Sequence, residues 1–425
     1  MRDTGKQRSL PSGDGKNELT LVSAVLCVSG ALDMVAPVVA NHHLRVCHAA
    51  LCLAREMNLP ADTVEQICLA ALLHDIGVLS LQERLDTLGF DCNDKQHAEF
   101  GYRLLSQWQA MSGPALLVRA HHDAYSRKKD CLEGHIIHLA DRIDVLLDRQ
   151  KYVLEQSLDV EEVILANAGE EFHPDVVEAF RSVAHRDSFW LDMQSPNIRD
   201  LIRSRSPQLT VVSMGGNDVE TMLEFGRLVA RIIDFRSPFT ATHSSGVAAV
   251  AEGLSRAHGF SGTRASLMRV AGYLHDLGKL ATPNEILEKP AGLTRSEVRV
   301  VRAHPYHTLN LLSAVPQLLE LARWAAFHHE RPRGGGYPFN LRGNDLGLEA
   351  RIMAVADVFT AITEDRPYRK GMDRDQAVKV LCNMASSGSL CPESVNVLRE
   401  RYDDMNAARI HEQERARRSY GAVAG

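Results

Sequence analysis

A histidine and an aspartate stand side by side near the end of an apolar segment in the second half of the chain, where residues 273–280 read YLHDLGKL. Both side chains need polar partners when they are buried, because an unpaired polar group in an apolar environment is costly. A divalent metal ion would satisfy His275 and Asp276 together. A hydrogen-bonded pair in the core would satisfy them as well, so this dipeptide alone leaves both interpretations open.

The surrounding residues favour a metal site. His243 precedes His275 by 32 residues and opens a helical pattern whose apolar positions, at +4, +7 and +11, place it on the inward face. Further ligand types lie in or beside apolar segments: His304, His328, His329 and Asp357. Five histidines and two aspartates exceed the needs of one tetrahedral zinc ion and fit two metal ions that share a carboxylate. Nitrogen and oxygen ligands without sulfur favour iron or manganese, with zinc, nickel and magnesium as alternatives.

The same constellation occurs earlier in the chain. His42 precedes the pair His74-Asp75 by 32 residues, and the interval of 24 residues between the third histidine and the histidine pair is also repeated. Offsets kept over such distances indicate an internal duplication. It predicts a second metal site formed by His42, His74, Asp75, His97, His121, His122 and Asp141.

The two copies differ in their cations. The second copy has Lys279 three residues after its aspartate, where the first has Val78. At +9 and +12 from the last aspartate, the second copy has Arg366 and Arg369, and the first has uncharged residues. Positive charge suited to a phosphate therefore occurs in only one copy.

Composition is ordinary for a soluble globular protein, with 425 residues, 45% of them hydrophobic and 24% charged. A net charge of −6 argues against a dedicated DNA or RNA binder. The eight cysteines form no CxxC pair and are expected to be free thiols in a reducing cytoplasm. Leu21–Val28 is apolar but short and follows a polar start, so we expect neither a signal peptide nor a membrane span.

The pattern of apolar residues predicts an all-α protein with two tandem helical domains and little or no sheet. Strand-like alternation occurs only near Leu209–Val212, within a segment rich in Ser, Pro and Gly. We expect the following organisation: a flexible tail at 1–19, a first helical domain at 20–200, a linker at 201–216, a second domain at 217–405 and a charged tail at 406–425.

The motifs HDLGK, HP, HHE, GGGYP and DRPYR give residues 220–400 a resemblance to the HD-GYP family. These are all-helical bacterial phosphodiesterases that break down cyclic di-GMP or, in some members, 3′,3′-cyclic GMP-AMP. Residues 20–200 resemble a shorter HD-superfamily domain that lacks the GYP element. The resemblance also implies possible partners, namely a diguanylate cyclase or another signalling protein at the GYP loop, and a second copy in a homodimer.

The resemblance assigns roles by position. One metal ion would be held by His243, His275, Asp276 and Asp357, and the second by His304, His328 and His329, with Asp276 bridging. Lys279 would face the scissile phosphate. Arg366 and Arg369 would hold a substrate phosphate, with a solvated helix end as the alternative. Tyr337 in the GYP loop would anchor that loop or stack on a purine base.

Three positions depart from the family pattern. Phe239 stands where some members have a glutamate that holds a third metal ion, so we expect two. Pro332 and Arg333 replace the usual Trp-Asp, and Thr360 stands where an aspartate is common. These changes bear on substrate preference and partner contacts.

Two metal ions that share a carboxylate and a hydroxide would activate water and neutralise the phosphodiester charge, and Lys279 would add positive charge. The sequence thus predicts hydrolysis of cyclic di-GMP to pGpG or GMP. One alternative is a phosphodiesterase specific for 3′,3′-cyclic GMP-AMP, and another is a cyclic dinucleotide sensor without activity. For the first copy, a regulatory or structural role is favoured over an independent hydrolase.

Overall fold

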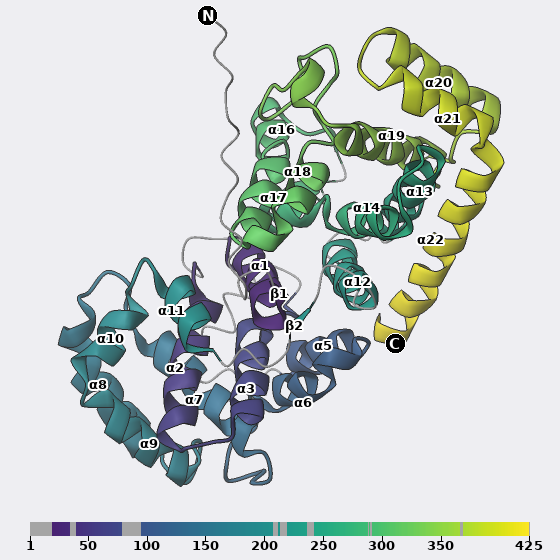
Figure 1. Cartoon of the computed structure of the whole chain (residues 1–425). Helices are drawn as coiled ribbons and strands as arrows, with labels where there is room; N and C mark the ends of the chain where they lie inside the picture. Colours follow the sequence, from purple (N-terminus) through teal and green to yellow (C-terminus); the bar gives the residue numbers. More distant parts are fainter. Residues whose placement is uncertain are drawn as a thin grey trace, which may run out of the picture.

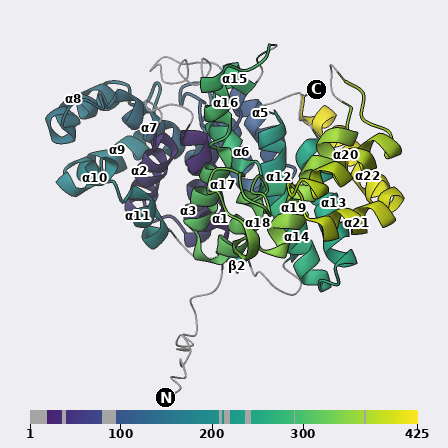
Figure 2. The ribbon, with the colours of Figure 1, turned by 90° about the horizontal axis from the view of Figure 1, so that it is seen from above.

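The computed structural model describes residues 19–34, 40–78, 95–206, 211–212, 219–235, 242–287, 289, 291–365 and 369–424. We refer to residues 20–200 as the first half and residues 217–424 as the second half. Almost all regular structure in the described part is helical, which confirms the predicted all-α tandem fold. The two halves lie side by side (Figures 1 and 2).

The helices of the first half, extended by one that crosses residue 200, are α1 (Leu21–Asp33), α2 (His42–Glu56), α3 (Ala61–Leu73), α5 (Gln96–Leu105), α6 (Ser112–Ala120), α7 (Leu132–Leu146), α8 (Val153–Ala166), α9 (Pro174–Ala184), α10 (Asp187–Met193) and α11 (Ile198–Arg205). A short 3₁₀ helix, η2 (Gln109–Met111), precedes α6.

The helices of the second half are α12 (Val219–Phe235), α13 (His243–Ala257), α14 (Gly262–Leu274), α15 (Asn284–Leu287), α16 (Arg295–Val301), α17 (His304–Ser313), α18 (Leu319–Ala326), α19 (Leu348–Thr363), α20 (Arg374–Ser386), α21 (Pro392–Glu400) and α22 (Tyr402–Ala424). Three 3₁₀ helices connect them: η5 (Leu277–Ala281), η6 (Pro316–Leu318) and η7 (Gly343–Asp345).

The duplication read from the sequence is visible in the order of the helices. Helices α2 and α13 each begin at the first histidine of their set, and α3 and α14 each end directly before the His-Asp pair. Helices α6 and α18 likewise precede the paired histidines, and α7 and α19 carry the last aspartate. Each half therefore brings its ligands together with the same set of helix ends.

Helix α1 lies between the two halves. It is apolar, every one of its residues is buried, and it contacts α3 of the first half as well as α17 and η5 of the second (Figure 1). Its apolar sequence is explained by this burial. Within the described residues, no helix combines the length and the apolar character that crossing a bilayer requires.

A single two-stranded sheet occurs in the described part of the chain. Strand β2 (Val211–Val212) lies within the segment where strand-like alternation was predicted, and it pairs antiparallel with β1 (Leu19–Thr20). Strand β1 was not predicted, because a two-residue strand has no periodicity to detect. The seven cysteines in the described residues are all free, as expected.

The structure differs from the expected charged tail at 406–425. Residues 402–424 form one continuous helix, α22, which packs along α13. Its charged and polar residues Arg409, Glu412 and Gln413 are buried, because they bond to one another and to the second half. Charge in this segment therefore marks a buried polar network. Similarly, α11 continues across the expected domain boundary at residue 200.

Candidate metal centres

The predicted ligands of the second half lie at helix ends. His243 and His304 are the first residues of α13 and α17, whereas His275 follows α14 directly and His328 lies two residues after the end of α18. Asp357 projects from within α19. Adjacent residues project about 100° apart on a helix, so His328 and His329 can reach one region only where the helix stops. Because the helices end here, the two adjacent ligands His275 and Asp276 can face the same region, and so can His328 and His329.

Backbone carbonyl groups fix the orientation of three histidine rings. The Nδ1 atoms of His275, His304 and His328 lie 2.8, 2.8 and 2.6 Å from the carbonyl oxygens of the residues three positions earlier. A carbonyl only accepts, so each Nδ1 donates and each Nε2 of the neutral ring keeps its lone pair. Such outer hydrogen bonds are typical of metal-ligating histidines.

The inner atoms of the site lack partners that a cation would supply. The Nε2 atoms of His304 and His328 are 3.3 Å apart, although both carry lone pairs when neutral. Burial lowers the pKa of His304 to about 3 and that of His329 to about 4, so both are neutral at pH 7. Asp276 Oδ1 is buried and accepts no hydrogen bond from the residues that the structure describes. These donor sets fit divalent metal ions.

Asp276 stands between two groups of ligands. Its Oδ2 atom lies 3.1 Å from Nε2 of His275, and its Oδ1 atom lies 3.2 Å from Nε2 of His304. One group of mutually close donor atoms comprises His243, His275 and Asp276, and another comprises His304, His328 and His329. Asp357 Oδ1 is 3.1 Å from Nε2 of His243. The structure therefore brings all seven predicted ligands into one region, with one carboxylate facing both groups.

Glu364 completes this region, and the sequence reasoning missed it. Nδ1 of His243 lies 3.2 Å from both carboxylate oxygens of Glu364. Burial lowers the pKa of His243, but the charges of Glu364 and Asp357 outweigh it and raise that pKa to about 10. Gln413 of α22 donates to Glu364 over 3.1 Å. The sequence did contain a signal for this role: Glu364 is a carboxylate one helical turn after Thr360, the position where an aspartate is common.

Two predicted substrate-binding residues lie at the margin of the site. Lys279 Nζ is 2.6 Å from Asp276 Oδ2, which places its charge beside the ligands. Arg369 is exposed and donates to the carbonyl oxygen of Ala361 in α19. Arg366 and Phe239 fall outside the described residues. The assignment of these residues to substrate phosphate stays a prediction.

Tyr337 stacks on a metal-ligand candidate. Its ring lies 4.7 Å from that of His329 at an interplanar angle of 28°, and the guanidinium of Arg302 lies 4.2 Å above it. This position agrees with the loop-anchor interpretation. Stacking on a purine base is not tested by these contacts.

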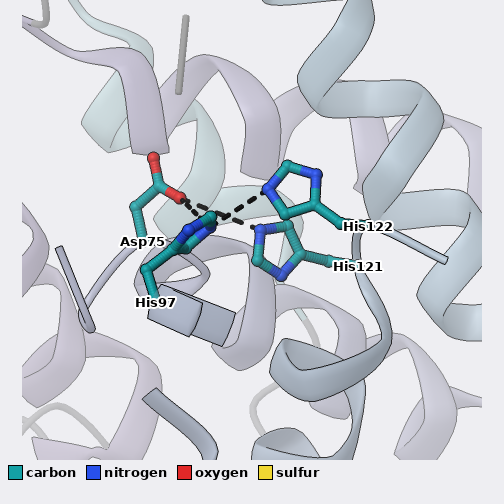
Figure 3. Close-up of side chains that lie close together, drawn as sticks. All are labelled: Asp75, His97, His121 and His122. Atoms are coloured by element: carbon teal, nitrogen blue, oxygen red, sulfur yellow. Dashed lines mark hydrogen bonds and ion pairs between the residues drawn. The ribbon is translucent and has the colours of Figure 1, made fainter. Parts of the chain in front are cut away.

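The first half assembles the second candidate centre. Figure 3 shows Asp75 with His97, His121 and His122, and the Nε2 atoms of His97 and His122 are 3.0 Å apart. Asp75 also belongs to a group with His42 and His74, whose Nε2 atoms are 3.2 Å apart. Nε2 of His121 is buried and has no hydrogen-bond partner among the described residues. These donor atoms fit metal ions for the same reason as in the second half.

Buried arginine charge distinguishes the first centre. Arg142 Nη2 lies 2.5 Å from Oδ2 of Asp141, whose Oδ1 atom is 3.4 Å from His42 Nε2. Asp144, which receives a hydrogen bond from His42 over 2.8 Å, is also paired with Arg45. The second half has Val358 at the position of Arg142. The negative charge of Asp141 is therefore partly neutralised by Arg142, a cation of the protein itself.

Comparison with known proteins places both halves in one family. Residues 39–146 and 227–393 each match a family model described as HD domain. Over 89% of its length, the chain is 30% identical to the 3′3′-cGAMP-specific phosphodiesterase 1 of Vibrio cholerae, and the match covers 91% of that protein. It is 40% identical over 142 residues to a cyclic di-GMP phosphodiesterase of Pseudomonas aeruginosa, which is 33% of this chain and 34% of that one.

A solved structure shares the fold. The crystal structure of a cyclic GMP-AMP-specific phosphodiesterase of V. cholerae matches 92% of this chain and 98% of its own, with a TM-score of 0.62 and 22% identity. The arrangement of both halves is therefore a shared architecture. Taken with the ligand geometry and the nearly full-length relative, it shows that the chain belongs to the HD-GYP-type cyclic dinucleotide phosphodiesterases.

Proposed function

We propose that the second half hydrolyses a phosphodiester bond of a 3′,3′-linked cyclic dinucleotide with two divalent metal ions. The observation that carries this proposal is the convergence of seven histidine and aspartate side chains on one buried region around Asp276. Bound metal ions supply an activated water and positive charge for the phosphoryl oxygens.

The residues of the chain would divide the work as follows. Asp276 presents one oxygen to each ligand group, so it would be the carboxylate that both metal ions share. Glu364 orients His243, and the backbone carbonyl groups orient His275, His304 and His328. Lys279, at 2.6 Å from Asp276, offers a further positive charge for a substrate phosphate.

Two substrates are candidates. Cyclic di-GMP is the substrate first expected from the sequence, and a relative matched within the second half carries that activity in its name. The relative that matches nearly the whole chain is named for 3′,3′-cyclic GMP-AMP, which favours this second candidate. Turnover of both at equal concentration by the full chain separates them, since a specific enzyme prefers one by tenfold or more.

The test of the proposal uses the same substitution in both halves. Asp276→Asn should lower turnover of either cyclic dinucleotide at least about a hundredfold, because the charge shared by the two ligand groups is lost. Asp75→Asn, at the equivalent position of the first half, is the matched control and should retain turnover within a few-fold. Full activity of the Asp276→Asn protein would overturn the proposal.

We also propose metal binding in the first half. Its seven-residue set supports this, while Val78 in place of lysine favours a regulatory or structural role for residues 20–200. Iron or manganese is the proposed metal in both halves, since the ligands are nitrogen and oxygen. We further propose a cytoplasmic location, a signalling partner at the GYP loop and a homodimer. We also propose that residues 201–216 link two separate domains.

A further inference from the structure

A polar pocket lies between α12, α13 and α22, and residues of all three helices line it. Its volume is about 110 Å³, and three arginines line it: Arg227, Arg231 and Arg415. Two carboxyl groups, of Asp234 and Glu412, also line it. Even with both ionised, the guanidinium groups outnumber the carboxylates.

Arg231 has no counter-ion in this pocket. Within the described residues, its guanidinium makes no hydrogen bond and no ion pair. Burial lowers its pKa, and the nearby charges of Arg227 and Arg415 lower it further. A partly buried guanidinium beside like charges is costly unless an anion or water satisfies its donors.

The other charges are already committed. Arg227 pairs with Glu220 at 2.8 Å, although its Nε atom is buried and has no hydrogen-bond partner in the described part of the chain. Glu412 is held by Arg269 at 2.6 Å and accepts a hydrogen bond from the Tyr273 hydroxyl at 2.9 Å. Arg415 is 3.8 Å from Glu412, which is too long for a hydrogen bond. Donor atoms of the arginines are thus in excess around the pocket.

The size of the pocket limits what can bind. A single water molecule needs only about 15 Å³ of such space, so about 110 Å³ leaves room for a group of several atoms. It does not hold a nucleoside. Arginine forks match the tetrahedral oxygens of phosphate better than they match a halide ion.

We propose that Arg227, Arg231 and Arg415 form a binding site for a tetrahedral oxyanion, either inorganic phosphate or the terminal phosphate of a mononucleotide whose base stays outside. This site is separate from the proposed hydrolytic centre and does not depend on it. The pocket lies beside a contact between the two halves and near the metal ligands of the second half. Ser419, which lines the pocket, bonds to Gln107 of the first half, and Tyr273 lies two residues before His275.

The test compares two arginines on α22. Both are exposed and two residues apart, but Arg415 lines the pocket and Arg417 does not. Binding of inorganic phosphate to the full metal-loaded chain is measured by calorimetry, with chloride at equal ionic strength as the reference. Arg415→Gln should weaken phosphate binding at least about tenfold, because charged hydrogen bonds are lost. Arg417→Gln has the same charge change and should stay within twofold of the parent.

Arg231→Gln should weaken phosphate binding as strongly as Arg415→Gln, and Arg231→Lys should restore part of it. Since Arg231 is partly buried, circular dichroism checks that the Arg231→Gln and Arg231→Lys proteins fold. If they do not fold, the comparison of Arg415→Gln with Arg417→Gln decides the outcome. Equal affinities in the Arg415→Gln and Arg417→Gln proteins would overturn the proposal, as would a parent chain that binds phosphate no better than chloride.

A parallel titration with GMP distinguishes the two sources of the oxyanion. The Arg415→Gln protein is expected to lose one binding event that the parent shows. If that binding event is at least tenfold tighter for GMP than for phosphate, the natural ligand is a nucleotide. Equal affinity in that binding event indicates free phosphate. Either result supports the site. Failure of the hydrolytic proposal would appear in turnover of the Asp276→Asn protein and leaves this comparison unaffected.

Discussion

At the scale of single residues, His243 shows how the outer partner of a ligand has changed between the two halves. In the first half, Asp144 bonds to Nδ1 of His42 from a position three residues after Asp141. The second half has Thr360 at that position, with its hydroxyl buried and without a hydrogen bond. Glu364, one turn further along and one methylene longer, provides the carboxylate instead.

Glu364→Gln should therefore weaken metal binding in the second half about 10- to 100-fold. The amide still accepts a hydrogen bond from His243 but no longer supplies negative charge. Metal content after dialysis against a weak chelator measures the effect. Glu400→Gln removes an exposed carboxylate and is the matched control. Unchanged metal retention in Glu364→Gln would show that Glu364 does not act on the ligand.

The same residues predict proton release on metal binding. The pKa of His243 is raised to about 10, so this ring is protonated at pH 7.5 before metal binds and must lose its proton to become a ligand. The pKa values of His304 and His329, about 3 and 4, mean that these rings are already neutral at pH 7.5 and release no proton when metal binds. Metal affinity at His243 should thus rise with pH up to about 10.

Calorimetry in two buffers of different ionisation enthalpy should show that His243→Asn releases about one proton fewer than the parent at pH 7.5. His329→Asn should leave the number of protons released per bound metal unchanged. If both variants released as many protons as the parent, the raised pKa of His243 would be wrong.

At the scale of helices, the ligand spacing was readable because it follows from helix ends that repeat in both halves. The predicted ligands at the ends of α13, α14, α17 and α18 lie close to one another, and Asp357 of α19 lies beside His243. Glu364 and Arg142 were missed because their roles depend on which helix faces them, and local periodicity carries no such information. Helix α22 was expected to be a tail for the same reason: its polar residues find partners that are distant in sequence, namely Tyr273 in α14 and Glu364 at the end of α19.

Removal of residues 406–425 distinguishes a tail from a structural helix. We expect the apparent Tm to fall by more than about 5 °C, because Tyr273 and Glu364 would lose their buried hydrogen bonds to Glu412 and Gln413. Removal of residues 421–425 alone should shift it by less than about 1 °C. Differential scanning fluorimetry measures both, and equal Tm values would favour the tail.

At the scale of the whole molecule, α1 is continuous with the first half in the chain but also packs on the second. Its residues are buried, and Leu311 of α17 lies close to Gly30 of α1. The strand pair β1–β2 adds a second link, because it joins the start of α1 to the segment between the halves. Neither half can therefore unfold without exposing apolar surface of the other, and a single cooperative transition is expected.

Leu311→Ala tests this coupling. The substitution should lower the free energy of unfolding by about 2–4 kcal/mol, since it opens a cavity beside α1, and it should separate the thermal transition into two. Leu158→Ala makes the same change at a residue that is 76% exposed and should leave the single transition in place. Differential scanning calorimetry of the full chain records both. Two separate transitions already present in the parent would show that α1 does not couple the halves.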